Sequence, residues 1–328
     1  MFCTHRGRFS LCLTPRTHTV LVFLETIFYA LSATTHVFLQ PMLHGSRLLA
    51  LSHGSPQGRN HILKALAKYS TITPLQFKRT LSALLVAGEL RIGNGFLSRL
   101  AANNWQATSP VRWNWSTEIA VITGGSGSIG RVIVEGLARR GITVVVSWST
   151  TRVAHGTFDT SDEYLHKIFE INLFCYWSAT REFLSNMSQR NKGHVVPIAS
   201  MGSFVTVGTS VDYSATKAGV LAFHEGLGNE LRYIYKAPGV LSTVVHPNYV
   251  QTPMTGMHEY RFVRQGTMLR AEDVGNRVVS QILARQGGQL ILPEHLALTT
   301  PALRGWPTWM QDGLRDIISK PVIAGLVS

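Results

Sequence analysis

The stretch Glu118–Gly130, EIAVITGGSGSIG, decides the fold of this chain. It opens with a short apolar, β-branched run, which is typical of a strand buried on both faces. Gly125, Gly127 and Gly130 follow at once in a GxGxxG pattern, and Arg131–Arg140 then has helical spacing. A glycine turn between a strand and a helix predicts a dinucleotide site, because a pyrophosphate must approach the backbone closely at the helix N-terminus. The alternative is a glycine-rich turn that binds no ligand.

Downstream of this turn, runs with strand character alternate with runs of helical spacing. Short apolar runs predict strands and longer periodic runs predict helices. The predicted strands cover 142–147, 194–200, 241–246 and 289–292, and the predicted helices cover 160–187 and 211–235. This alternation predicts an α/β fold, with a doubly wound parallel sheet that carries helices on both faces.

Tyr213 and Lys217 stand one helical turn apart within the second of these helices, so they share a face. A tyrosine is a poor base at neutral pH because its reference pKa is about 10, and a nearby ammonium lowers that pKa by stabilising the phenolate. Ser200, at the end of a predicted strand, can hydrogen-bond a substrate oxygen and stabilise developing charge. Together these residues indicate general acid–base chemistry, whereas the Tyr–Lys pair alone could be a surface coincidence.

Gly124–Gly130, Asn172, Ser200 and the YSATK run at 213–217 together resemble the short-chain dehydrogenase/reductase family. The resemblance implies a Rossmann-like fold and an oxidoreductase that uses NAD or NADP. Tyr213 would be the catalytic acid or base, and Lys217 would lower its pKa and hold the nicotinamide ribose. Ser200 would position the substrate, and Asn172 would support a water-linked proton relay.

The same resemblance implies a set of cofactor-binding residues and a substrate class. The set comprises Thr123, Gly124, Ser128, Ile129, Gly130, Tyr213, Lys217, Pro247, Val250 and Thr252. The membrane-associated subgroup that acts on retinoid- or steroid-like alcohols is the nearest likeness. We therefore expect a small lipophilic alcohol or carbonyl as substrate, no metal and no nucleic-acid partner, and a homodimer is a possible assembly.

The chain departs from the family between Gly130 and Ser200, where it offers only one helix, one strand, a second helix and the serine strand. Two further αβ units, roughly 45–55 residues, are expected there. The break lies near residues 149–153, where Ser149-Thr-Thr-Arg152 stands in place of the family's Asn-Asn-Ala-Gly. The missing fourth strand would leave a seam in the sheet, and we expect Ile142–Ser147 to slide into it.

Three smaller departures affect the cofactor and the sheet. Ser128 takes the place of a family glycine in the loop, and Pro197 removes a backbone donor from a strand that should be central. Trp148 and Ser149 stand where an acidic residue would bind the adenosine ribose, so the choice between NAD and NADP stays open. Two functions also stay open, namely an active enzyme and a catalytically impaired, membrane-attached relative that serves as a binding protein.

The N-terminal third has a separate character. Residues 1–112 carry 12 Lys and Arg against 2 Asp and Glu, and 14 of the 20 residues in 20–39 are apolar. That run has about the length of a membrane span, although a buried segment or a cleaved signal fits as well. Leu81–Leu100 reads as a helix lying at a membrane interface. The basic residues alternate with aliphatic ones instead of a stacking platform, which argues against nucleic acid.

We therefore expect three regions along the chain. Residues 1–112 form a membrane-associating extension, 113–300 the dinucleotide-binding catalytic domain, and 301–328 an amphipathic C-terminal tail. The expected location is a membrane of the endoplasmic reticulum or a lipid droplet. Trp306–Ile318 has a helix-like apolar face, which could pack on the core, dock on a membrane or cover the substrate pocket.

Overall fold

The computed structural model describes residues 3–5, 8–10, 73–105, 113–124, 127–146, 156–253, 255 and 268–327. The chain divides into two compact units, residues 26–98 and a larger unit formed by 1–25 with 99–328. The apolar run 20–39 and the expected break at 149–153 lie outside the described residues.

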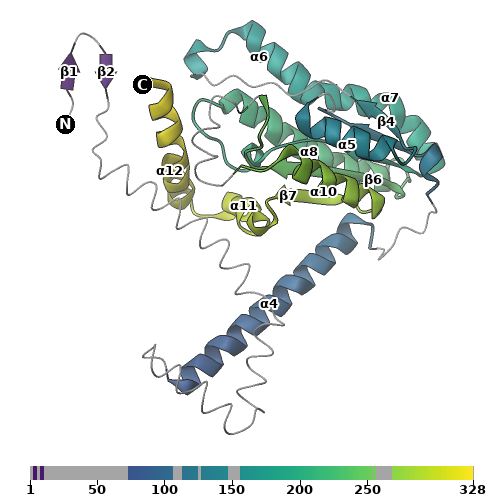
Figure 1. Cartoon of the computed structure of the whole chain (residues 1–328), viewed down its shortest axis with the longest axis horizontal. Coiled ribbons are helices and arrows are strands. Elements are labelled where there is room, and N and C mark those ends of the chain that lie inside the picture. Colours follow the sequence, from purple (N-terminus) through teal and green to yellow (C-terminus); the bar gives the residue numbers. More distant parts are fainter. Residues whose placement is uncertain are drawn as a thin grey trace. The chain divides into compact units, whose positions relative to one another are not determined.

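The larger unit is built on a parallel sheet of five strands in the order β4-β3-β5-β6-β7 (Figure 1). The strands are β3 (Ile119–Ile122), β4 (Thr143–Val146), β5 (Gly193–Val196), β6 (Val240–Pro247) and β7 (Gly288–Leu292). Each of them lies within or close to a run that the sequence predicted to be a strand. The predicted α/β class and parallel sheet are confirmed.

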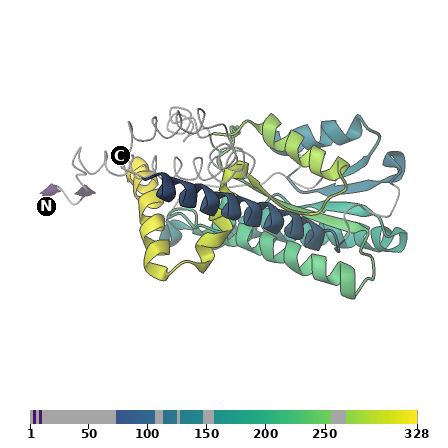
Figure 2. The ribbon, with the colours of Figure 1, turned by 90° about the horizontal axis from the view of Figure 1, so that it is seen from below.

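Helices cover both faces of this sheet (Figure 2). One core cluster contains side chains of α5 (Ser128–Ala138) and α10 (Ala271–Leu283). The other contains side chains of α7 (Cys175–Arg190) and α8 (Val211–Tyr233). Successive residues of β3 supply the two cores in turn, because side chains alternate along a strand: Ala120 and Ile122 belong to the first core and Val121 to the second. The doubly wound arrangement is therefore confirmed.

The seam left by the missing strand is closed by direct pairing of β3 with β5. Ala120 faces His194, Val121 faces Val195, and Ile122 faces Val196 across this join. Meanwhile β4 stays on the other side of β3, with Ile119 opposite Thr143. The expectation that Ile142–Ser147 slides into the seam is therefore wrong. Closing β5 onto β3 pairs the backbone of both strands without removing β4 from its own partner.

Pro197 marks the point where the β5 ladder stops. Strand β5 ends at Val196, and the amide of Ile198 donates to the hydroxyl of Thr123 at 3.4 Å instead of to a backbone carbonyl. The Pro197 carbonyl still accepts a hydrogen bond from the amide of Val245, at 3.0 Å. A proline is tolerated here because a side chain takes over the pairing just beyond it.

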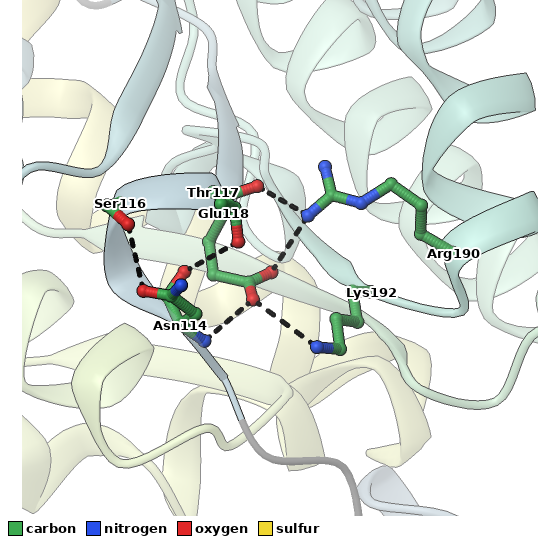
Figure 3. A network of polar contacts seen from close by, with 6 residues as sticks. All are labelled: Asn114, Ser116, Thr117, Glu118, Arg190 and Lys192. Carbon is green, nitrogen blue, oxygen red and sulfur yellow. Dashed lines mark hydrogen bonds and ion pairs between the residues drawn. The ribbon is translucent and has the colours of Figure 1, made fainter.

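A buried ionic cluster links the segments that precede β3 and β5 (Figure 3). Glu118 precedes β3, and its carboxylate is 1% exposed and accepts from the Asn114 amide at 3.1 Å. Arg190 and Lys192, between α7 and β5, lie 4.0 and 3.9 Å from this carboxylate, and the Arg190 guanidinium also donates to the Thr117 carbonyl. A buried carboxylate requires such partners, so this cluster fixes the join at its N-terminal end.

We predict that Glu118→Gln lowers the free energy of unfolding by roughly 1–3 kcal/mol, because it leaves two cations without their buried counter-charge. Glu135→Gln is the matched control, since Glu135 forms an exposed ion pair with Arg131 on α5 and should have little effect. Urea unfolding followed by circular dichroism measures both. Equal effects of the two substitutions would contradict a special role for the buried cluster.

The remaining helices frame the sheet and the chain ends. They are α6 (Asp162–Phe169), a π-helical turn at Glu170–Phe174, α11 (Thr299–Ala302) and α12 (Thr308–Val327). The helix predicted at 160–187 is thus α6 and α7 joined by a π turn, and the helix expected near 306–318 is α12. Helix α10 has no counterpart among the predicted elements.

The described parts of the N-terminal third consist of one short hairpin and one long helix. Strands β1 (Cys3–His5) and β2 (Arg8–Ser10) pair in antiparallel fashion, and α4 spans Pro74–Ala102. Thr73 and Gln76 form a reciprocal capping box at the start of α4, with bonds of 2.9 and 3.3 Å. Within the described residues, no helix has both the length and the apolar character required for a membrane crossing. The three-region division remains a prediction.

Candidate active site

The serine, tyrosine and lysine singled out in the sequence lie together beyond the carboxyl end of β5. The Nζ atom of Lys217 is 5.5 Å from the centre of the Tyr213 ring. A Cβ atom added at Gly202 would lie 3.5 Å from the Ser200 Oγ and 3.6 Å from the Tyr213 ring. The hydroxyl and the phenol ring therefore border the same point, and only a residue without a side chain leaves that point open.

A short turn at Met201–Ser203 connects the serine to the helix of the other two residues. The Ser200 hydroxyl caps this turn by accepting from the Gly202 amide at 3.1 Å. The Ser203 hydroxyl donates to the backbone carbonyl of Lys217 at 2.9 Å. The turn thus holds Ser200 at a fixed position relative to α8.

Lys217 is fully buried, and its ammonium donates to the Ile198 carbonyl at 2.9 Å. The same carbonyl accepts from the Tyr176 hydroxyl at 2.8 Å. Burial lowers the pKa of Lys217 to about 7, a decrease that the nearby Cys175 thiol partly opposes. The site therefore keeps an ionisable ammonium beside a phenol at the cost of withdrawing it from water.

We predict that Lys217→Met raises the free energy of unfolding of the cofactor-free protein by roughly 1–3 kcal/mol at pH 7. The Lys217 pKa is depressed in the folded state, so protonation favours unfolding below a pH of about 10.5, and removing the amine removes that penalty. Tyr176 still satisfies the Ile198 carbonyl in the variant. The gain should shrink as the pH approaches 10, which parallel thermal melts measure. A destabilised variant at pH 7 would contradict this reasoning.

Asn172 is fully buried within the π turn and faces α8. Its amide nitrogen donates to the Thr216 hydroxyl at 3.4 Å, and that hydroxyl donates to the Tyr213 carbonyl at 2.6 Å. The structure thus brings Asn172 to the helix of Tyr213, and it adds Thr216 as a linking residue. A π turn inside a helix often marks a functional site, and helical periodicity alone does not indicate one.

The predicted cofactor residues of the glycine turn lie between β3 and α5. Thr123 and Gly124 follow β3, and Gly124 has φ +72°, a conformation that side chains rarely adopt. Ser128, Ile129 and Gly130 form the first turn of α5, whose N-cap is Gly127. With glycine at the cap, the first amides of α5 face outward without a capping side chain, as an anion site requires. Gly125 and Ser126 lie outside the described residues.

The remaining predicted cofactor-binding residues, Pro247, Val250 and Thr252, lie at the end of β6 and in the loop after it. Pro247 is the last residue of β6, and buried Val250 forms an isolated bridge with Leu269. The Thr255 hydroxyl orders this loop by accepting from the Thr252 amide at 3.1 Å and donating to the Val250 carbonyl at 2.6 Å. Because all strands are parallel, this loop, the glycine turn and Ser200 lie at the same edge of the sheet.

His246 is a neighbour of the site that the sequence did not single out. Its Nδ1 lies 3.1 Å from the Ser200 carbonyl and therefore donates to it, and its ring packs on that of Phe204 at 4.7 Å. Burial lowers the pKa of His246 to about 4, so the ring is neutral at pH 7. The available signal was an ionisable residue near the end of the buried strand β6.

Two further histidines share this behaviour, and together they predict a pH dependence. Burial lowers the pKa of His194 to about 3 and that of His224 to about 4, so the unfolded chain binds more protons below pH 6.5. Stability should be complete above that value and fall on acidification, by roughly 1–2 kcal/mol per histidine at pH 5. Urea titrations at pH 7 and pH 5 test this, with His194→Gln as a variant that loses less. Equal stability at both values would contradict it.

Comparison with known proteins finds dehydrogenases among the similar sequences. The short chain dehydrogenase model matches residues 151–260. Dehydrogenase RED2 of Cochliobolus heterostrophus is 29% identical over 222 residues, covering 53% of this chain and 83% of RED2. The chain is thus similar to short-chain dehydrogenases over part of its length. Estradiol 17-beta-dehydrogenase 11 of Homo sapiens is 32% identical over 150 residues, 46% of this chain and 48% of that protein. Retinol dehydrogenase 10 of Rattus norvegicus is 35% identical over 114 residues, 34% of this chain and 33% of that protein.

The alignment with RED2 also contains positions that this chain lacks. It extends over 222 positions, yet 53% of the 328 residues is only about 174. About 48 positions of RED2 therefore have no counterpart here, which agrees with the 45–55 residues expected from the spacing of the elements. By contrast, the chain spans less than half of the length of estradiol 17-beta-dehydrogenase 11 and of retinol dehydrogenase 10.

Proposed function

We propose that this chain is an NAD(P)-dependent oxidoreductase that interconverts a lipophilic alcohol and its carbonyl. The observation that carries the proposal is the buried ammonium of Lys217 beside the Tyr213 ring, with the Ser200 hydroxyl on the other side of Gly202. A phenol and a hydroxyl that both border Gly202, with an ammonium 5.5 Å from the centre of the phenol ring, suit the transfer of a proton to or from a substrate oxygen.

The residues present fit a nicotinamide dinucleotide. The left-handed Gly124 and the outward-facing amides of α5 suit the pyrophosphate, and Lys217 and the Pro247–Thr252 loop suit the nicotinamide end. The bound nicotinamide ring would supply or accept the hydride. NAD and NADP remain equal candidates, because residues 147–155 lie outside the described residues.

The protein's own part in the reaction is proton transfer and orientation. During oxidation Tyr213 would take the hydroxyl proton while the hydride leaves the carbon, and during reduction it would return that proton to the carbonyl oxygen. Ser200 would donate to the substrate oxygen. Asn172 and Thr216 would hold the backbone of Tyr213 in place through their hydrogen bonds.

Support for a lipophilic substrate and a membrane location comes from the relatives' names and from the N-terminal third. Two relatives are named for estradiol and retinol, which are apolar alcohols. The basic and apolar residues 1–112 suit an anionic membrane surface such as that of the endoplasmic reticulum or a lipid droplet. We accordingly propose the regions 1–112, 113–300 and 301–328 as extension, catalytic domain and tail, with a homodimer as one assembly to examine.

A second candidate is a binding protein without turnover. The shortened sheet favours it, since the positions absent relative to RED2 would include a strand beside the adenosine half of the cofactor. The intact grouping of Ser200, Tyr213 and Lys217 favours the enzyme.

We predict that Tyr213→Phe lowers kcat/KM by roughly 10²–10⁴-fold, because the variant keeps the ring and loses the proton carrier. Tyr233→Phe is the matched control, since Tyr233 lies on the same helix and is 69% exposed. Turnover is followed by the absorbance of the reduced nicotinamide, with retinol and estradiol as probe alcohols. Wild-type protein that binds the probes but shows no turnover would favour the second candidate.

A further inference from the structure

The C-terminal segment holds the loop that runs from Ser200 to Tyr213. The Arg304 guanidinium donates through Nε to the Phe204 carbonyl and through Nη2 to the Ser203 carbonyl, both at 2.9 Å. Further along the chain, in α12, the Ser319 hydroxyl accepts from the Gly208 amide at 3.0 Å. The C-terminal segment thus bonds to the first half of the loop, at Ser203 and Phe204, and to its second half, at Gly208.

We propose that Arg304 is a positioning residue for the active site, an inference that rests on the proposed function. Its guanidinium donates to two consecutive backbone carbonyls of the turn that follows Ser200. Because the guanidinium is planar, this pair of hydrogen bonds fixes both the distance and the orientation of the turn relative to Arg304. Arg315 of the same segment, by contrast, pairs with Asp312 at 3.2 Å in an exposed surface contact.

The path from Arg304 to the reacting groups is short. Ser203, whose carbonyl Arg304 holds, donates its amide to the Ser200 carbonyl at 3.0 Å and its hydroxyl to the Lys217 carbonyl at 2.9 Å. The Ser203 side chain is only 2% exposed, so the turn has little freedom on its inner side. A tie on the outer side then determines where the Ser200 hydroxyl points.

The second half of the loop is strained and contains buried polar groups without partners among the described residues, which a contact from outside the loop can offset. Thr209 has φ +70°, a strained conformation for a β-branched residue. Among the described residues, the buried hydroxyls of Thr209 and Ser210 have no hydrogen-bond partner. Gly208 packs so closely on Ile323 that an added Cβ would lie 3.1 Å from its Cδ1. The segment after β7 therefore packs on this loop and holds it from outside.

Loss of this tie should disturb the reaction more than cofactor binding, because Arg304 acts on the serine turn and not on the glycine turn. We expect Arg304→Ala to lower kcat by roughly 10–100-fold, the effect of displacing a positioned group by about 1 Å. Affinity for the reduced dinucleotide should stay within about twofold of the wild type, because the tie touches no residue of the glycine turn. Millimolar guanidinium should restore part of the lost activity by binding in place of the side chain.

The test compares Arg304→Ala with Arg315→Ala in two measurements. Hydrogen exchange requires no turnover, and it should quicken at the amides of 202–210 in Arg304→Ala, with α10 unchanged and Arg315→Ala like the wild type. Guanidinium rescue of kcat should be specific to Arg304→Ala. Unchanged exchange and unchanged kcat in Arg304→Ala would overturn the proposal, as would activity loss that guanidinium does not restore. Faster exchange in a protein whose wild type has no turnover would support the tie and reject the proposed function.

Discussion

The direct pairing of β3 with β5 is the constraint on which the site depends. The two strands carry the glycine turn and the serine turn at their carboxyl ends, so their register sets how the two turns meet. In a sheet with an intervening strand they would lie about one strand spacing further apart. Here the Thr123 hydroxyl already reaches the Ile198 amide at 3.4 Å, so the two strand ends are joined by a side chain as well as by the backbone ladder.

The site is built from polar groups withdrawn from water, and each one has a partner that keeps it at its position. The Ile198 carbonyl receives both the Lys217 ammonium and the Tyr176 hydroxyl. Burial raises the pKa of Tyr176 well above its usual range, so this second phenol is neutral and serves as a fixed donor. Tyr176 is thereby a structural donor, whereas Tyr213 is partly exposed and is the phenol to which we assign the proton transfer.

The glycine loop and the Tyr–Lys spacing were predictable from the sequence because their signals are local. Period and spacing within a few residues indicated β3, α5 and the shared face of Tyr213 and Lys217. The place of Ile142–Ser147 was predicted wrongly, since strand order depends on which backbone groups remain unpaired across the whole sheet. Thr216, His246 and Arg304 were missed because only tertiary contacts distinguish them, and Arg304 lies far from the loop in sequence.

If the proposed function holds, a sheet closed by direct pairing of β3 with β5 still binds a dinucleotide. The most direct measurement is a titration of the purified chain with NADH and with NADPH, followed by the fluorescence of the bound nicotinamide. We expect saturable binding of one dinucleotide per chain, with competition by the oxidised form. Fluorescence that rises without saturation, or that does not change, would contradict it.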